Sequence, residues 1–347
     1  MSSRLTCSRA EELLTKGDLI ALGQAADEER RRRFPGDIVT FIIDRNINYT
    51  NVCVSGCKFC AFYRPAGHPE AYALSHEAIL DKVRETVAAG GTQIMLQGGL
   101  HPGLMLEYYT ELLTKIKQQS DIIVHSFSPA EIIFLARQNG LKPAEVLARL
   151  QVAGLDSLPG GGAEILVDSV RQRVSPEKIT AGDWLAVMRA AHGLGMKTTA
   201  TMVIGLGESL ADRVNHMDAV RRLQEETGGF RAFIMWSYQP GNTALGGEKT
   251  SAWDYLRTLA VARLYLDNFD HIQGSWVTQG ERIGQLTLAF GADDLGSIML
   301  EENVVRAAGT AYEMSVDKMT SLIRGAGRTP AQRDTTYKIL KVYGEKP

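Results

Sequence analysis

The sequence has no excess of charge of either sign and no long apolar run. Its 347 residues include 38 Lys and Arg against 40 Asp and Glu, which gives a formal net charge of -2. A chain without a positive field has no general attraction for nucleic acid or for an anionic membrane. A membrane-spanning helix needs about 20 consecutive apolar residues, and no stretch approaches that length. We therefore predict a cytoplasmic protein that binds neither nucleic acid nor a membrane.

Cysteine is also scarce, since the chain has only four. Four cysteines are too few for a disulfide scaffold, and clustered thiols in a reducing compartment more often bind metal or carry out redox chemistry. Cys7 stands alone near the N-terminus, whereas Cys53, Cys57 and Cys60 share the stretch NVCVSGCKFCAFY. This stretch is the first candidate for a functional site.

Basic residues are dense in one place only, from Arg30 to Arg33, directly before Phe34, Pro35 and Gly36. A basic run before a turn is typical of the solvated end of a helix. We favour this interpretation over a phosphate contact.

Apolar runs rich in β-branched residues alternate with longer segments of helical periodicity, as in repeated strand–helix units. Eight runs are expected to be strands, and they begin at Asp37, Gln93, Asp121, Leu155, Lys197, Arg231, His271 and, least regularly, Leu286. The expected helices span 75–89, 104–118, 129–138, 143–153, 181–194, 209–227 and 251–268.

Eight strands that read as buried on both faces predict an α/β fold closed into a (β/α)8 TIM-type barrel. The main alternative is an open doubly wound sheet, but no G-x-G-x-x-G follows the first strand. Glycine and polar clusters instead follow nearly every strand, at the end where barrel enzymes build their sites. We expect residues 1–36 to form an N-terminal helical extension. Residues 37–347 then form the barrel domain, with C-terminal helices packed outside.

The three clustered thiols are compatible with three kinds of site. A structural zinc site needs a fourth ligand, for which His68 and Cys7 are the candidates, although zinc ligands are usually spaced in pairs. An electron-transfer iron–sulfur cluster normally takes four cysteines. The third possibility is a [4Fe-4S] cluster with three thiolates and one iron open to a ligand that is not protein.

The pattern C-x3-C-x2-C, with Phe59 directly before the last cysteine, resembles the signature of the radical S-adenosylmethionine (SAM) superfamily. The resemblance implies that Cys53, Cys57 and Cys60 hold a [4Fe-4S] cluster whose open iron is chelated by SAM. In that superfamily an electron from the cluster cleaves SAM to methionine and a 5'-deoxyadenosyl radical.

The resemblance also implies where SAM binds. The glycines after the second strand would let backbone oxygens approach the methionine ammonium, aromatic side chains near the cysteines would face adenine, and a carboxylate after the fourth strand would contact SAM. The expected SAM contacts are Phe59, Phe62, Gln97, Gly98, Gly99, Ser126, Ser128 and Glu164. A strand-to-helix turn, loop packing or a helix N-terminal charge would explain some of these residues equally well.

From about residue 37 to 310, motifs such as SWVTQG and QPGN make the chain similar to the dehypoxanthine futalosine cyclase family of menaquinone biosynthesis, the futalosine pathway. Aminofutalosine synthases and the deazaflavin chromophore synthases are the alternative relatives. The resemblance implies hydrogen abstraction from C4' of the substrate ribose, closure of a new ring onto the aromatic ring, and loss of one electron and one proton. A non-catalytic iron–sulfur or zinc-binding barrel is the alternative of a different class.

This reading assigns further residues and partners. The partners are the small molecule dehypoxanthine futalosine and an electron donor such as flavodoxin or ferredoxin. The candidate catalytic residues are His125, Glu164 and Tyr63, and the candidate substrate contacts are Arg45, His101, Asn242, Trp276 and Gln279.

Overall fold

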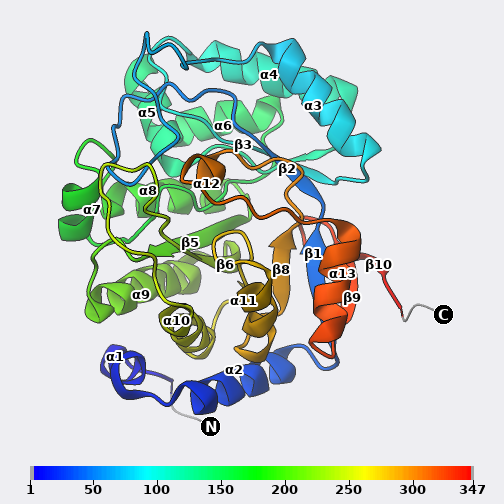
Figure 1. The fold of residues 1–347 in the computed structure, drawn as a ribbon. Helices are drawn as coiled ribbons and strands as arrows, with labels where there is room; N and C mark the ends of the chain where they lie inside the picture. Colours follow the sequence, from blue (N-terminus) through cyan, green and yellow to red (C-terminus); the bar gives the residue numbers. More distant parts are fainter. Residues whose placement is uncertain (1–3, 345–347) are drawn as a thin grey trace.

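The computed structural model describes residues 4–344, and Figure 1 shows a ring of parallel strands surrounded by helices. The barrel strands are β1 (Ile38–Ile42), β2 (Asp44–Ile47), β3 (Gln93–Leu96), β4 (Ile123–Val124), β5 (Thr198–Ile204), β6 (Phe230–Ser237), β7 (His271–Gln273) and β8 (Asp294–Ser297). The helices that follow them are α3 (His76–Ala88), α4 (Leu106–Gln119), α5 (Pro129–Asn139), α6 (Pro143–Ala153), α7 (Asp168–Val174), α8 (Ala181–Gly193), α9 (Leu210–Thr227) and α10 (Ala252–Tyr265). The predicted helices are therefore confirmed within a few residues.

The strands form two parallel ladders, β5-β6-β7-β8-β1 and β2-β3-β4. Single contacts join them. Leu300 N donates to Asp44 O on one side at 3.0 Å, and Thr199 N donates to Leu158 O on the other at 3.3 Å. The predicted (β/α)8 architecture is thus confirmed, with the fourth position around the ring occupied by a short segment that pairs only through Ser157 and His125.

Three strand predictions were wrong in detail. The run from Leu155 forms an isolated bridge at Ser157 and no strand. The first apolar run is split at Ile43, so that β1 pairs with β8 while β2 pairs with β3. The run from Leu286 is not a strand, because 281–289 form α11 (Glu281–Leu286) and the 3-10 helix η1 (Thr287–Ala289). The true last strand, β8, has the sequence DLGS. The polar residues of this sequence gave no signal for a strand. Asp294 is nevertheless buried there, because it pairs with Arg333.

The N-terminal helices α1 (Cys7–Lys16) and α2 (Leu19–Arg33) lie beneath the barrel, at the end where the strands begin (Figure 1). The basic run on α2 is not uniformly solvated as predicted. Arg30 is fully buried and pairs with Asp27 at 2.7 Å, while Arg33 donates to the carbonyl of Phe269 at 3.0 Å. These contacts attach α2 to the barrel floor. The division of the chain at residue 36 stays a prediction.

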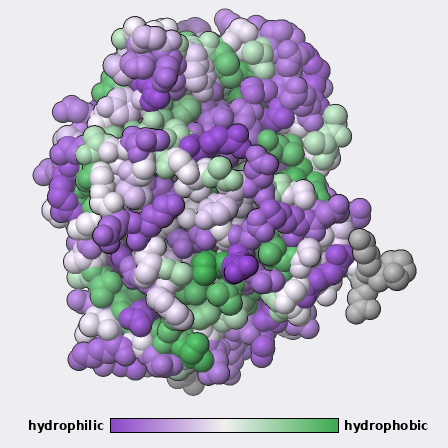
Figure 2. Space-filling model, in the orientation of Figure 1, coloured by the Kyte–Doolittle hydropathy of each residue, from purple (hydrophilic) through white to green (hydrophobic). Residues whose placement is uncertain are grey.

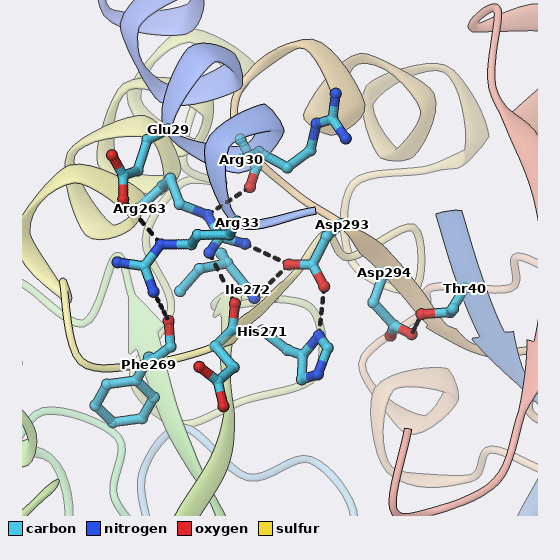
Figure 3. Close-up of polar contacts among 12 residues, drawn as sticks. Glu29, Arg30, Arg33, Thr40, Arg263, Phe269, His271, Ile272, Asp293 and Asp294 are labelled. Carbon is cyan, nitrogen blue, oxygen red and sulfur yellow. Dashed lines mark hydrogen bonds and ion pairs between the residues drawn. The ribbon is translucent and has the colours of Figure 1, made fainter. Parts of the chain in front are cut away.

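A buried ion-pair network lies beside this contact (Figure 3). Arg263 of α10 pairs with Asp293, which also accepts from Ile272 N at 2.8 Å and lies 2.6 Å from Nδ1 of His271. Burial alone would raise the pKa of Asp293, but Arg263 and His271 hold it below the ordinary value. The carboxylate is therefore charged, and it joins β7, β8 and α10.

The C-terminal region contains the expected helices and two strands that were not expected. Helix α13 (Val316–Gly325) packs outside the barrel, whereas the short helix α12 (Val304–Ala307) lies over the carboxyl ends of the strands. Strand β9 (Thr329–Arg333) then pairs in parallel with β1. Strand β10 (Ile339–Val342) forms a hairpin with β9 at the edge (Figure 1). Through β9 the chain end delivers Arg333 to the barrel interior.

The face drawn in Figure 2 is mostly hydrophilic, and its apolar side chains form separate small patches. No helix among the described residues is long and apolar enough to cross a membrane.

Asp293→Ala should strongly destabilise the chain, because it leaves the fully buried Arg263 without its carboxylate. Removing one partner of a buried pair costs about 3–5 kcal/mol of unfolding free energy. Chemical denaturation of the full chain measures the loss. Glu226→Ala is the control, because Glu226 and its partner Arg189 are both half exposed, and we expect little change. Equal effects of the two variants would contradict the importance of the network.

Candidate functional site

The loop after β2 brings its three clustered cysteines to one pocket at the carboxyl ends of the strands. Cys53, Cys57 and Cys60 all line this pocket together with Phe59 and Phe62. Burial raises the pKa of the Cys57 and Cys60 thiols, while backbone N–H groups of residues 62 and 63 and the nearby Lys178 oppose the rise. N–H groups aimed at sulfur stabilise the thiolate form, which is the form that binds metal.

The cysteine pocket has a second wall built of glycine. A Cβ on Gly99 would lie 2.1 Å from the carbonyl oxygen of Val52, and one on Gly98 would lie 2.5 Å from the ring of Tyr49. Only glycine lets the strand-end backbone come this close to the cysteine loop. Gln97, Gly98 and Gly99 line the pocket as the sequence predicts.

Glu164 lies in the cysteine pocket with a partner that sequence reasoning missed. Its Oε1 accepts from Nζ of Lys178 at 2.7 Å, and Arg171 lies 3.6 Å from Oε2, an oxygen without a hydrogen bond among the described residues. Glu164 also has φ of 41°, which is rare for a residue with a side chain. Lys178 lines the same pocket, 5.5 Å from the ring centroid of Phe59. No local sequence pattern marks Lys178.

Glu131 is a second functional candidate that was missed. It accepts from Tyr49 Oη at 2.6 Å, from Ser128 Oγ at 2.6 Å and from Gly98 N at 3.3 Å, and it lines the cysteine pocket. Glu131 therefore fixes the glycine wall in place. The sequence could have indicated Glu131, because Ser128-Pro-Ala-Glu131 has the spacing of a capping box. Burial raises the pKa of Glu131 to about 7.

A second cavity extends inside the barrel below the cysteine pocket, and the two share Gln97, Gly161, Thr201 and Trp236. We call it the lower cavity. His125 and Trp276 both line it. Trp276 is buried and donates from Nε1 to Ser297 O at 2.9 Å.

Several predicted residues lie outside both cavities. Ser126 is fully buried and accepts from Leu96 N at 2.9 Å, so that its contact is with strand β3. Arg45 contacts Glu85 of α3 at 2.6 Å. The other three are His101, which caps its own turn; Asn242, which donates to Ala307 O; and Gln279, which donates to Ser237. By contrast, Tyr63 and Ser128 line the cysteine pocket.

The other proposed ligands lie apart from the three cysteines. Cys7 is in α1, and its sulfur contacts Tyr265 Oη at 3.2 Å. His68 is exposed, and its Nδ1 accepts from Glu70 N at 3.1 Å. Neither lines the cysteine pocket.

The cysteine pocket suits a multinuclear cluster. Among residues 4–344, no three His, Cys, Asp or Glu side chains are grouped so as to hold a metal ion. In an iron–sulfur cluster each thiolate binds a different iron. Three thiols around one pocket can therefore hold such a cluster. Soft sulfur donors, together with the close approach that Gly99 permits, fit a cluster with an adjacent ligand.

Two protein-family signatures match the chain. The Radical SAM superfamily matches residues 47–220, and the CofH/MqnC C-terminal region matches residues 227–345. The chain therefore belongs to the radical SAM superfamily and is an enzyme, and this membership implies a [4Fe-4S] cluster and SAM. The electron-transfer and zinc alternatives are not supported.

Within the superfamily the chain closely resembles one kind of enzyme. It is 48% identical to the cyclic dehypoxanthine futalosine synthase of Halalkalibacterium halodurans over 99% of this chain and 93% of that protein. The synthase of Streptomyces coelicolor is also 48% identical, over 99% and 87%. A Methanopyrus kandleri 5-amino-6-(D-ribitylamino)uracil–L-tyrosine 4-hydroxyphenyl transferase is 42% identical over 92% and 89%.

Solved structures support the fold. Methylornithine synthase (PylB) superposes with a TM-score of 0.75 at 19% identity, covering 95% of each chain. The hydrogenase maturase HydG of Carboxydothermus hydrogenoformans gives 0.78 at 17% identity, covering 96% of this chain and 77% of that one.

Cys57→Ser should abolish cluster assembly, because a hydroxyl is a poor ligand for iron where a thiolate is needed. We expect the variant to retain little iron and sulfide after anaerobic reconstitution, and to lack the visible absorbance of a cluster. Cys7→Ser is the matched control and should reconstitute normally. A Cys7 variant that also lost its iron would contradict the three-cysteine site.

Glu131→Gln should alter how stability depends on pH. A carboxyl with a folded pKa near 7 holds its proton more tightly when folded than when unfolded. Raising the pH from about 4.5 to 7 should therefore destabilise the wild type relative to the variant, with no further change above that range. The free energies of unfolding of both proteins across this range measure the difference. A constant difference would contradict the raised pKa.

Proposed function

We propose that the chain converts dehypoxanthine futalosine to cyclic dehypoxanthinyl futalosine in menaquinone biosynthesis. The observation that carries the proposal is 48% identity to two synthases of that name over 99% of the chain. The two connected cavities support it, because one has the donors for a cluster and SAM and the other offers space for a substrate.

A [4Fe-4S] cluster bound by Cys53, Cys57 and Cys60 would supply the electron that cleaves SAM to methionine and a 5'-deoxyadenosyl radical. The side chains around it then have to hold SAM and exclude water. Phe59 and Phe62 supply apolar surface in the cysteine pocket, and Val304 and Val305 of α12 close its mouth. Holding reactants at near-attack distance in a closed site accounts for much of such a rate enhancement.

The substrate loses two hydrogens in this reaction. One leaves C4' of the ribose as a hydrogen atom and becomes part of 5'-deoxyadenosine, and the other leaves the aromatic ring as a proton after the new carbon–carbon bond forms. The accompanying electron would return to the oxidised [4Fe-4S] cluster, the one-electron acceptor that the proposed site would contain. The protein must therefore supply a base next to the ring.

We propose His125 as that base. Ser157 Oγ donates to Lys197 O at 2.5 Å, so its other two contacts, Arg231 and Nδ1 of His125, must donate to it. The Nδ1–H tautomer leaves the Nε2 lone pair without a hydrogen bond among the described residues, in a side chain that lines the lower cavity. Burial, with Arg231 and Arg333, holds the pKa of His125 well below its ordinary value, so the ring is neutral. Tyr63 and Glu164 remain candidates in the cysteine pocket.

An external reductant must deliver the electron that starts the reaction, and we propose a small electron-transfer protein such as flavodoxin or ferredoxin. We also propose that the reaction takes place in the cytoplasm.

The second candidate function is that of the transferases. It is favoured by the 42% identity of the Methanopyrus kandleri protein and by the match to the CofH/MqnC C-terminal region. Its substrates, tyrosine and a ribitylaminouracil, differ from dehypoxanthine futalosine, so a substrate test separates the two functions.

The reconstituted and reduced enzyme should form 5'-deoxyadenosine when given SAM and dehypoxanthine futalosine, and a product two hydrogens lighter than the substrate should appear in the mass spectrum. Tyrosine with the ribitylaminouracil should give no coupled product. The opposite substrate preference would support the transferase function. Absence of 5'-deoxyadenosine with either substrate set would contradict a radical reaction.

A further inference from the structure

One half-buried arginine in the lower cavity has no carboxylate partner. Among the described residues, no Asp or Glu oxygen lies within the 4.0 Å ion-pair limit of Arg231, and its only side-chain hydrogen bond is the one to Ser157. The arginines that are more deeply buried than Arg231 each have a carboxylate within that limit. These are Arg30, Arg171, Arg213, Arg221, Arg263 and Arg333.

The backbone directs Arg231 into the lower cavity. Thr198 pairs with Phe230 and the next residue, Thr199, pairs with Ala232, so that Arg231 is an extra residue in β6. Such a bulge turns a side chain away from the regular alternation. Phe230 consequently stacks outside on Phe269, while Arg231 lines the lower cavity.

Desolvating a cation without an ion-pair partner is costly. Burial lowers the pKa of Arg231 to about 10, although Tyr337 and the more distant Asp334 and Asp156 oppose the change. The other arginine of the lower cavity, Arg333, is neutralised by both oxygens of Asp294, at 2.6 and 3.0 Å. The hydroxyl of Tyr337 also lines the cavity without a hydrogen-bond partner among the described residues. Tyr337 is held by stacking on His271, with ring centroids 3.5 Å apart. The floor thus presents one cation without an ion-pair partner, and one hydroxyl without a hydrogen bond, among the described residues.

We propose that Arg231 binds the carboxylate of the substrate at the floor of the barrel, with the Tyr337 hydroxyl as a second donor. The identity of this ligand as the benzoate end of dehypoxanthine futalosine rests on the proposed function. The inference that this site binds an anion is independent of the proposed function.

Strand β6 runs from the proposed anion site at Arg231 towards the cysteine pocket. Trp236 lines both cavities and stands five residues beyond Arg231, about 16 Å along a strand. A substrate anchored at Arg231 therefore extends towards the cysteine pocket. The carboxylate would also offset one of the charges that keep His125 neutral, which would improve Nε2 as a proton acceptor during the reaction.

Binding of benzoate to the reconstituted full-length enzyme with SAM tests the anion site without turnover. Isothermal titration should show that the wild type prefers benzoate to the neutral benzamide. Arg231→Met should weaken benzoate binding by about 30-fold or more, the usual effect of removing one partner of a buried charge pair. Arg231→Lys should retain part of the affinity. Arg189→Met, which removes an exposed arginine, is the control and should bind as the wild type does.

Stability distinguishes a binding role from a structural one. Arg231 has no carboxylate to leave behind, so Arg231→Met and Arg231→Gln should unfold at a temperature no lower than that of the wild type. A large loss of stability in both variants would overturn the proposal by showing that Arg231 holds the barrel together. Failure of the wild type to prefer benzoate would overturn it as well.

Turnover separates this inference from the proposed function. With dehypoxanthine futalosine and its carboxylate methyl ester, the wild type should favour the acid in kcat/KM, and Arg231→Met should lose that preference mainly through KM. Retained preference in the variant would overturn the anion site while the function stands. Benzoate binding that depends on Arg231, without any turnover of dehypoxanthine futalosine, would support the site and reject the substrate.

Discussion

Two adjacent carboxylates, Asp293 and Asp294, hold the lower end of the barrel together. Successive residues of a strand face opposite sides, so the two side chains point apart. Asp293 pairs with Arg263 of α10 and His271 of β7, and Asp294 accepts from Thr40 of β1 (Figure 3). Asp294 also pairs with Arg333 of β9. The pair joins α10, β7, β1 and β9, segments distant in sequence. Neither carboxylate could be buried without its arginine.

Neutralisation of Arg333 by Asp294 has a consequence for chemistry. The lower cavity would otherwise contain two unpaired guanidinium groups, and a substrate with one carboxylate could satisfy only one. With Arg333 paired, the remaining positive charge is that of Arg231, which shares the hydroxyl of Ser157 with His125. In the proposed reaction the cavity would combine a cation that binds the substrate carboxylate with a neutral imidazole that accepts a proton, two functions that require different electrostatic surroundings.

The sequence was informative wherever a local pattern carried the structural information. The cysteine spacing, the glycines after β3 and the helix periods predicted the cluster loop, the pocket wall and the barrel. It failed where a distant partner decides the outcome. The strand DLGS exists because Arg333, 39 residues later, neutralises Asp294. Lys178 lies in the pocket because Glu164 pairs with it across a loop. Arg45 resembles a substrate contact in sequence, but α3 supplies its acid.

Backbone strain is concentrated at the end of the barrel where the chemistry is proposed. Four residues with side chains have positive φ in segments that follow barrel strands: Phe127, Glu164, Asn242 and Met299. Such conformations cost on the order of 1–3 kcal/mol each and persist only where surrounding contacts impose them. At Glu164 those contacts are Lys178 and Arg171, and the result is a carboxylate beside the cysteines. The strained backbone at the mouth and the paired charges at the floor thus lie at opposite ends of the same strands.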